Sequence, residues 1–391
     1  MKRLTNTVRD YAWGSHTAIA SLRGRPVPSA EPEAELWMGA HPSAPSVLPD
    51  EDGGIPLTDF IAKDPFAALG QQVLDRFGPR LPYLMKLLAA AQPLSLQAHP
   101  DLEQAAVGYA AERAAGLAID DPASTYPDAN HKPELLVAVE QFDALCGFRD
   151  PGESADLLES LAVPALEPVV AALRTGSVSQ RLRGAVDLLM AWPDGDRSPL
   201  VAAVAASGHP LGAQLGRLYP GDPGVVVALL LNQIRLRPDE AVFMPAGNLH
   251  AYLSGFGVEV MAASDNVLRG GLTPKRVDVA ELLRVLRYEV LAEPVVRPVA
   301  LGPGLVTWPA PVPDFSLTRA QTSAGMTVRL PAGGPRIMCC LRGPAQLSTG
   351  AGTGAEVLRL DGGDSVFVGA GEPAIEVSGP EAIVFQSTSM G

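Results

Sequence analysis

The sequence predicts a mainly β protein interrupted by a helical insertion, and three changes of pattern along the chain support this fold class. From Met1 to about Phe148, short apolar runs alternate with Pro, Gly and Ser breaks, which is typical of β-structure with some helices. From 150 to 232, apolar residues recur at three- and four-residue spacing, as in packed helices. From 293 onward, runs such as MTVRL and RIMCCL again indicate strands.

These patterns divide the chain into four segments. Residues 1–149 and 233–292 are expected to form two parts of one β domain, which residues 150–232 interrupt as a helical insertion domain. Residues 293–391 are expected to form a second, C-terminal β domain. This last segment contains no histidine, so we expect a metal site only in the first β domain.

Composition excludes several classes of function. The formal net charge of −13 argues against nucleic acid as a partner, because phosphate backbones require a basic surface. The cysteines, Cys146, Cys339 and Cys340, form no CxxC pair and are expected as buried thiols in a reducing compartment. The longest apolar runs, 84–91 and 225–231, are shorter than the roughly 20 residues that span a membrane. We expect a cytoplasmic monomer that binds a small molecule and contacts neither nucleic acid nor membrane.

The stretch LSLQAHPD places polar side chains where burial is expected. Residues 85–91 form an apolar run, and Ser95, Gln97 and His99 follow at two-residue spacing. Residues i and i+2 of a strand point to the same face, so these three side chains should share one face. A buried row of polar groups needs partners, which either a ligand or hydrogen bonds between strands would supply.

The segment PAGNLHAYLSGFGVEV predicts a second polar face. A Pro-Ala-Gly turn leads into a strand that carries His250 and Tyr252 on one side. We predict that residues 254–257, SGFG, form the loop of a hairpin, so that Tyr252 faces Glu259. His250, Tyr252 and Glu259 would then project from one face of that hairpin.

These faces and Glu134 together suggest a metal site. Glu134 stands at the start of the apolar, strand-like run in NHKPELLVAV. Two imidazoles, one carboxylate and one amide oxygen form a plausible ligand set for Zn²⁺. Such a set carries a charge of only −1, which would leave the ion its Lewis acidity. The alternative is that these side chains are hydrogen-bonded polar groups of the strands.

Lysine usage gives an independent indication, because only five of the 30 basic residues are lysines. Lys86 lies inside the apolar run YLMKLLAAA, where a lysine is costly unless it is paired or near an anion. Lys132 lies in NHKPE, and Lys275 follows SDNVLRGGLTP, which also offers Asp265 and Arg269. We interpret these lysines as phosphate or hydroxyl contacts, with snorkelling or salt-bridged side chains as the alternative.

The motifs together resemble the type I mannose-6-phosphate isomerases, or phosphomannose isomerases. The resemblance rests, in chain order, on YAWGS, ELWMGAHPSAPS, PYLMKLL, LSLQAHPD, HKPE, FMPAGNLHAYL and SDNVLRGGLTPK. These motifs run from Tyr11 to about Asp278 and are highly specific together, whereas the C-terminal third resembles the family only in pattern. The tripeptide VRD before YAWGS departs from the family's usual Gln-Asn.

The resemblance implies a cupin-like fold, in which jelly-roll β-sandwiches carry a helical insertion and a second, metal-free β domain. It also implies one zinc ion per chain as the cofactor. The implied zinc ligands are Gln97, His99, Glu134 and His250. Arg269 matches the family's active-site position. The positions that match the substrate pocket are Lys86, Ser95, Lys132, Tyr252, Glu259 and Lys275.

The implied reaction interconverts mannose 6-phosphate and fructose 6-phosphate through a cis-enediol, linking fructose 6-phosphate to mannose metabolism and GDP-mannose supply. It needs a base at the C2 proton, positive charge at the enediolate oxygens and a basic pocket for the phosphate. Glu259 is our first choice of base, with a salt bridge to a lysine as the alternative. Rival proton carriers are Lys132, Asp265 and His131. Trp13 is a candidate sugar platform, with core packing as the alternative.

Two other functions stay open at this point. A non-catalytic sugar-binding cupin would keep the pocket but lose the acid–base groups, whereas Glu259, Lys132 and Arg269 are all present. A metal-dependent oxygenase of the cupin class would more naturally use three imidazoles, or two with a carboxylate, and redox-active iron. A glutamine ligand and several basic residues favour zinc and a phosphorylated substrate.

Overall fold

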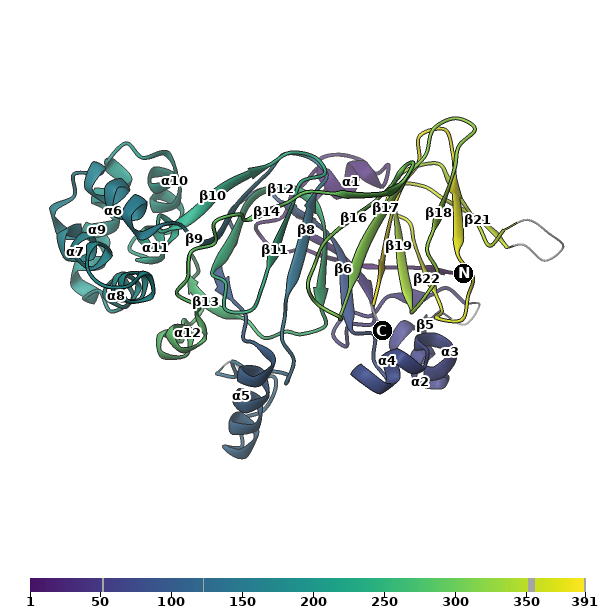
Figure 1. Cartoon of the computed structure of the whole chain (residues 1–391), viewed down its shortest axis with the longest axis horizontal. Coiled ribbons are helices and arrows are strands. Elements are labelled where there is room, and N and C mark those ends of the chain that lie inside the picture. The colour runs from purple at the N-terminus through teal and green to yellow at the C-terminus, as the bar shows by residue number, and fades with distance from the viewer. Residues whose placement is uncertain (51–52, 122, 351–355, 390–391) are drawn as a thin grey trace.

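The computed structural model describes residues 1–50, 53–121, 123–350 and 356–389, and Figure 1 shows it with its longest axis horizontal. A cluster of helices lies at one end, the C-terminal strands lie at the other, and the largest sheet lies between them. The chain is therefore mainly β with a helical insertion, as the sequence predicts.

The largest sheet has 11 strands in two layers that share strand β12. One layer has the order β14-β11-β8-β12-β6-β3-β2, and in the other layer β12 pairs with β7 and β9, which pair in turn with β13 and β10. The strands are β2 (Thr7–Arg9), β3 (Glu35–Gly39), β6 (Tyr83–Ala90), β7 (Leu96–Ala98), β8 (Glu134–Ala138), β9 (Phe142–Phe148), β10 (Leu231–Leu236), β11 (Ala241–Met244), β12 (His250–Ala262), β13 (Leu268–Gly271) and β14 (Val295–Val296).

Strand β12 joins the two layers because it bends at Gly255. Residues before the bend pair with β9, and residues after it pair with β6 and β8. Gly255 has a φ of +138°, and a Cβ there would lie 2.5 Å from the Phe142 ring, so the bend requires glycine. The predicted hairpin loop at 254–257 is therefore wrong, because these residues continue a single strand.

The predicted shared face is nevertheless confirmed by the two-residue alternation on each side of the bend. Ala251 and Leu253 pack in the core shared with the helical insertion. Val258 packs in the core shared with the C-terminal strands. Tyr252 lies between the two layers, where its hydroxyl reaches Glu259. The bend thus brings both halves of β12 around one interior space.

The helical insertion covers the outer face of the layer that contains β7. Side chains such as Leu158, Leu182 and Leu215 pack there against Leu96 and Leu145. This one-sided burial accounts for the three- and four-residue spacing in the sequence. The helices are α6 (Pro151–Ser160), η1 (Pro164–Leu166), α7 (Glu167–Arg174), α8 (Val178–Met190), α9 (Asp194–Ala206), α10 (Pro210–Leu218) and α11 (Gly224–Ala228).

The C-terminal strands form a second sandwich. A seven-stranded sheet, β1-β22-β19-β24-β17-β16-β15, and a four-stranded sheet, β18-β23-β20-β21, enclose a core that includes Leu330 and Met338. Trp308 and Ile337 pack instead against the first β domain. The strands are β1 (Lys2–Leu4), β15 (Val299–Gly302), β16 (Leu305–Trp308), β17 (Ser316–Gln321), β18 (Thr327–Leu330), β19 (Arg336–Arg342), β20 (Ala345–Ser348), β21 (Val357–Leu360), β22 (Ser365–Val368), β23 (Ile375–Ser378) and β24 (Ile383–Thr388).

Strand β1 pairs with β22, so the N-terminus lies within the C-terminal sandwich (Figure 1). The division at residues 149, 232 and 292 stays a prediction. The other elements are α1 (Ala18–Leu22), β4 (Val47–Leu48), β5 (Ile55–Pro56), α2 (Leu57–Lys63), α3 (Pro65–Leu69), α4 (Gln71–Phe77), α5 (Leu102–Ala114) and α12 (Val279–Val285). Among the described residues, no helix has both the length and the apolar character needed to cross a membrane.

Candidate active site

Three buried side chains converge between the two layers of the large sheet. Glu134 begins β8, His250 begins β12, and His99 directly follows β7. Nε2 of His99 lies 3.4 Å from Oε1 of Glu134, and Nε2 of His250 lies 3.3 Å from Oε2. One ligand atom from each residue lies within 4.8 Å of the others. This cluster has the size and chemistry of a site for one metal ion.

Backbone carbonyls orient both imidazoles toward Glu134. Nδ1 of His99 lies 2.7 Å from the Asn266 carbonyl oxygen, and Nδ1 of His250 lies 3.0 Å from that of Asn248. Because a carbonyl only accepts, each Nδ1 carries a proton, and each Nε2 is turned toward Glu134. Both Nε2 atoms and Oε2 of Glu134 are buried without a hydrogen-bond partner in the described part of the chain. A metal ion would satisfy all three atoms.

Local charges favour the metal-binding protonation states. Burial and the neighbouring Lys132 ammonium lower the pKa of His99 from 6.5 to about 4. Burial by itself raises the pKa of Glu134, but Lys132 and the imidazoles outweigh it and hold that pKa well below its usual value. Nζ of Lys132 lies 2.9 Å from Oε1 of Glu134. At neutral pH, His99 is therefore neutral and Glu134 is ionised, as metal ligands must be.

Gln97 lies beside this cluster in the sheet. Strand β7 runs between β12 and β13, and Gln97 is opposite His250 on one side and Arg269 on the other. Ser95 and Gln97 line the cavity next to the cluster, whereas Leu96 between them packs in the core shared with the helices. The predicted alternation is thus confirmed, and the role of Gln97 as a ligand stays a prediction.

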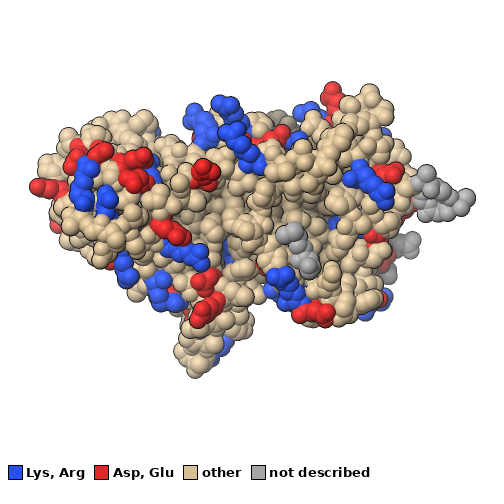
Figure 2. Space-filling model, in the orientation of Figure 1, with Lys and Arg blue, Asp and Glu red and all other residues tan. Residues whose placement is uncertain are grey.

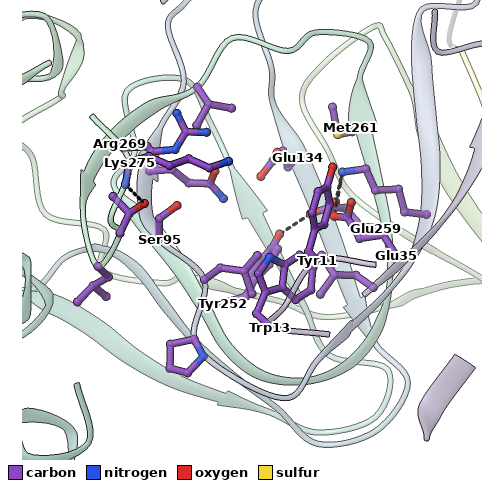
Figure 3. Close-up of a pocket in the computed structure, with 18 of the residues that line it drawn as sticks. Tyr11, Trp13, Glu35, Ser95, Glu134, Tyr252, Glu259, Met261, Arg269 and Lys275 are labelled. Carbon is purple, nitrogen blue, oxygen red and sulfur yellow. Dashed lines mark hydrogen bonds and ion pairs between the residues drawn. The ribbon is translucent and has the colours of Figure 1, made fainter. Parts of the chain in front are cut away.

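A cavity of about 590 Å³ opens beside the metal-ligand cluster (Figure 3). In this view Arg269, Lys275 and Ser95 lie on one side, Glu35 and Glu259 lie on the other, and Glu134 lies between them. The structure brings nearly all the predicted residues to the cavity wall. Those that line it are Trp13, Lys86, Ser95, Gln97, Lys132, Glu134, Tyr252, Glu259, Asp265, Arg269 and Lys275.

Lys86 lies at the centre of a buried charge network. Its Nζ is 3.3 Å from Oε1 of Glu35 and 3.1 Å from Oε2 of Glu259. Burial by itself lowers the pKa of Lys86, but the two carboxylates raise it above its usual value. Burial also raises the pKa of Glu259, although Lys86 opposes that rise. The Tyr252 hydroxyl donates to Oε1 of Glu259 at 2.8 Å. A buried carboxyl with a raised pKa beside a cation suits proton transfer.

The other two candidate proton carriers have different surroundings. Nε2 of His41 lies 3.1 Å from Oδ1 of Asp265. Burial raises the pKa of Asp265, but the contact with His41 and the charges of Lys132 and Lys86 together outweigh burial and lower that pKa below its usual value. Nε2 of His131 lies 3.0 Å from Oδ2 of Asp314, and His131 is outside the described lining of the cavity. Asp265 therefore lies nearer to the place where a substrate would bind.

Sequence reasoning missed Glu35 and Tyr219. Glu35 lies in ELWMG, a strand whose five residues are all buried, and Nε1 of Trp37 donates to its Oε2 at 2.7 Å. The sequence predicts Lys86 as a site residue because a charged side chain inside an apolar strand is costly unless it is paired. The same reasoning could have identified Glu35. Tyr219 reaches the cavity from the end of α10, and its hydroxyl donates to the Pro93 carbonyl at 2.8 Å. No spacing rule predicts this contact between distant segments.

Comparison with known proteins places this geometry in a family. A family model described as phosphomannose isomerase type I, catalytic domain, matches residues 1–151. The mannose-6-phosphate isomerase of Escherichia coli (strain K12) is 39% identical over 97% of this chain and 97% of its own length. Mannose-6-phosphate isomerase 1 of Arabidopsis thaliana is 32% identical over 95% of this chain and 89% of its own length.

Solved structures agree along the whole chain. A mutant phosphomannose isomerase from Salmonella typhimurium superposes with a TM-score of 0.91 at 36% identity, covering 100% of this chain and 99% of that one. A zinc-bound mannose 6-phosphate isomerase superposes with a TM-score of 0.90 at 36% identity, covering 99% of both chains. The likeness includes the C-terminal domain, which the sequence motifs did not reach. The chain belongs to the type I phosphomannose isomerases.

Proposed function

We propose that this protein is a zinc-dependent aldose–ketose isomerase that interconverts mannose 6-phosphate and fructose 6-phosphate. The observation that carries the proposal is that one cavity lies beside the buried metal-ligand cluster, whose Glu134 lines it, and is also lined by the cationic side chains of Arg269 and Lys275 (Figure 3). The 39% identity to a mannose-6-phosphate isomerase over nearly the full chain supports the choice of substrate. A sugar phosphate needs both features, because its two ends differ in chemistry.

The phosphate end of the substrate would bind at Arg269, Lys275 and Ser95. The Arg269 guanidinium and the Lys275 ammonium supply charge, and the Ser95 hydroxyl supplies a further hydrogen bond. The sugar chain would then extend past Gln97 toward Glu134. Trp13, Tyr252 and Lys86 line the space available to its hydroxyl groups. Fixing the phosphate in this way places the reacting carbons beside the metal-ligand cluster.

The metal ligands would be His99, Glu134 and His250, with the Gln97 amide oxygen as the fourth. Zinc bound there supplies a Lewis acid that polarises oxygens of the sugar and stabilises developing negative charge. Lys132, 2.9 Å from Glu134, keeps that carboxylate ionised and adds positive charge beside the sugar oxygens. Arg269 would stabilise the enediolate or hold the phosphate.

Glu259 is the base that the surroundings favour. In the open-chain aldose it would take the proton from C2, giving a cis-enediolate. A proton would then pass from O2 to O1 through the cis-enediol, and the same carboxyl would return its proton to C1 to give the ketose. The Tyr252 hydroxyl orients one carboxylate oxygen, and Lys86 keeps the other close to a cation. Lys132 and Asp265 also line the cavity and are the rival proton carriers.

We further propose that the protein acts as a cytoplasmic monomer, without a nucleic-acid partner, at the step that supplies mannose 6-phosphate for GDP-mannose. The buried thiols Cys146, Cys339 and Cys340 suit a reducing compartment. The face in Figure 2 has acidic and basic side chains interspersed, which does not favour binding to a phosphate backbone. Light scattering would measure the oligomeric state.

We also propose that the domains divide at residues 149, 232 and 292, as the sequence predicts.

A product assay tests the isomerase proposal. Zinc-loaded protein is incubated with mannose 6-phosphate or with free mannose, and formation of the ketose is followed by NMR. We expect fructose 6-phosphate from the first substrate and little or no ketose from the second. Free mannose lacks the phosphate that Arg269 and Lys275 would bind. Binding of mannose 6-phosphate without conversion would contradict the proposal and would favour a sugar-binding cupin. Consumption of oxygen would instead favour an oxygenase.

A further inference from the structure

Asn266 is a fully buried polar residue that the proposed reaction does not use. It lies between β12 and β13, in the segment SDNVLRGG, and its exposed fraction is 0%. Its neighbours Asp265 and Val267 line the cavity, but Asn266 is outside the described lining. A buried amide needs partners for all its polar atoms, so its contacts indicate its role.

The side chain of Asn266 binds the backbone of a distant segment. Its Nδ2 donates to the carbonyl oxygens of Asp128 at 2.8 Å and Asn130 at 2.7 Å. Its Oδ1 accepts from the backbone N–H of Asp128 at 3.3 Å. This segment leads within a few residues to Lys132 and Glu134. The Asn266 amide therefore fixes the approach of the chain to a metal ligand.

The backbone of Asn266 holds a second metal ligand. Its carbonyl oxygen accepts from Nδ1 of His99 at 2.7 Å, which turns Nε2 of His99 toward Glu134. Three residues later, Arg269 is opposite Gln97 in the β13–β7 pairing. One residue thus connects the segments that carry His99, Glu134 and Arg269.

Ser264 and Asp128 complete the same network. The Ser264 hydroxyl lies 3.1 Å from Oδ2 of Asp128 and 3.1 Å from the Asn130 carbonyl oxygen, and it accepts from the Asn266 backbone N–H at 3.2 Å. Oδ2 of Asp128 also accepts from the Asp265 backbone N–H at 2.8 Å. We call Asp128, Asn130, Ser264 and Asn266 the Asn266 network. Only an amide offers two N–H donors and one acceptor at this distance from the backbone, which is why asparagine fits at its centre.

We propose that Asn266 is a positioning residue that sets the affinity of the site for zinc. The inference rests on the proposed zinc site. Without the amide donors, the 128–130 segment would separate from the 264–266 segment. The Asn266 carbonyl, which orients His99, would then shift with the 264–266 segment. Groups that orient metal ligands typically contribute about 10- to 100-fold in metal affinity.

The test uses Asn266→Leu, which keeps approximate size and neutrality but removes every side-chain hydrogen bond. The zinc dissociation constant is measured by competition with a chromophoric chelator, and the unfolding of the metal-free protein is measured in urea. Asn232→Leu is the matched control. The Asn232 amide also donates to backbone carbonyls, at 3.1 Å to Cys146 and 2.8 Å to Leu291, and neither carbonyl holds a metal-ligand side chain.

We expect Asn266→Leu to raise the zinc dissociation constant by about 10- to 100-fold, with Asn232→Leu within about twofold of the unchanged protein. Equal zinc affinity in all three proteins would overturn the proposal, as would a loss in both variants that follows their loss of stability. If Asn266→Leu does not fold, Ser264→Ala removes one hydroxyl of the network, and an unchanged dissociation constant there overturns the proposal. Failure of the unchanged protein to bind zinc would instead refute the proposed cofactor.

Discussion

At the scale of single residues, two features of its surroundings shift the pKa of Glu259 in opposite directions. Burial favours the neutral acid, whereas Lys86 favours the carboxylate. Lys86 itself is shared, because Glu35 lies almost as close as Glu259. This arrangement lets Glu259 gain or lose a proton without leaving Lys86 unpaired. A carboxylate that only balanced Lys86 would be redundant with Glu35.

Glu259→Gln and Glu35→Gln separate the two roles of the carboxylates. Each change leaves Lys86 with one carboxylate, but only the first removes the group that we assign to proton transfer. We expect Glu259→Gln to lower kcat by about 100- to 10,000-fold, the usual contribution of a general base, and Glu35→Gln to lower it much less. Steady-state kinetics of the zinc-loaded variants measure this, and equal losses would support the salt-bridge role alone.

Single residues of the site could be predicted where burial and charge conflict within one short stretch. Lys86 and Glu134 lie beside or inside apolar runs, and His99 follows such a run closely. Asn266 gives no such signal, because it acts through carbonyls of residues 128 and 130, far away in the sequence. The pairing of His41 with Asp265 could not be predicted either, because the two residues are far apart in the sequence. Contacts across the fold need the fold to be known.

At the scale of elements, the helical insertion contributes to the phosphate end of the cavity. Asp222, just before α11, accepts from the Thr273 backbone N–H at 3.2 Å and from that of Gly224 at 2.7 Å. Gly271 has a φ of +120°, and a Cβ there would lie 2.7 Å from Cα of Gly224. The insertion therefore packs tightly on the segment that leads to Lys275.

Asp222→Ala should loosen this segment and weaken substrate binding. Losing one net hydrogen bond, about 1 kcal/mol, corresponds to a KM for mannose 6-phosphate about fivefold higher, with kcat little changed. Asp150→Ala is the control, because Asp150 caps α6 through the N–H groups of Gly152 and Glu153, in the same insertion. Steady-state kinetics would show the effect, and an equal rise of KM in both variants would contradict a specific role for Asp222.

Helix α12 is tied to the chain that precedes β8 through Glu281. Its carboxylate accepts from the Tyr126 hydroxyl and pairs with Arg284. The hydrogen bond from Arg284 lowers the pKa of Glu281, and Tyr126 lowers it further, although burial opposes both. A carboxyl whose pKa is lowered in the fold stabilises the fold above its unfolded pKa. That stabilisation is lost as the pH falls through the lowered pKa of the folded state.

Glu281→Gln should therefore destabilise the protein in a pH-dependent way. We expect a loss of about 1 kcal/mol or less at pH 7, since the pair is partly exposed, and a smaller difference at pH 4, below the ordinary pKa of 4.5. Urea unfolding at both pH values measures this. Glu153→Gln, on the exposed first turn of α6, controls for loss of charge. If Glu281→Gln lowered the free energy of unfolding as much at pH 4 as at pH 7, the lowered pKa of Glu281 would not be the source of the stabilisation.

Elements with a clear apolar pattern could be predicted, such as α8 from its three- and four-residue spacing and β6 from its nearly continuous apolar run. The bend in β12 could not be predicted, since SGFG reads locally as a turn and continues as a strand only when β6, β8 and β9 lie beside it. Tertiary pairing thus overrides the local turn signal at Gly255. The error did not displace the site, because the alternation shifts by one residue at the bend, and Tyr252 before it and Glu259 after it therefore still face the same interior space.

At the scale of the whole molecule, Tyr83 joins the two β domains. Its hydroxyl lies 3.0 Å from the Pro335 carbonyl oxygen and 2.9 Å from that of Ser387, and it accepts from the Ile337 N–H at 3.1 Å. All these partners belong to the C-terminal sandwich, whereas Tyr83 begins β6. The first domain therefore depends on the second for part of its stability.

Tyr83→Phe should destabilise the protein while leaving the site intact. The change removes the buried hydroxyl that accepts from the Ile337 N–H and lies within hydrogen-bonding distance of two carbonyl oxygens, and losing such buried hydrogen bonds costs about 1 to 3 kcal/mol. We expect this loss in urea unfolding, with kcat and KM of the folded protein unchanged. Tyr109→Phe is the control, because the Tyr109 hydroxyl has no hydrogen bond among the described residues. Equal stability of Tyr83→Phe and the unchanged protein would contradict a structural role for the hydroxyl.

Metal removal tests the central claim most directly. The protein is treated with a chelator, freed of it, and assayed for conversion of mannose 6-phosphate before and after zinc is restored, with unfolding measured alongside. We predict that chelation abolishes conversion, that one zinc per chain restores it, and that Glu134→Ala binds zinc too weakly to be restored. Full activity of the metal-free protein would contradict the account, because His99, Glu134 and His250 would then have no part in the reaction.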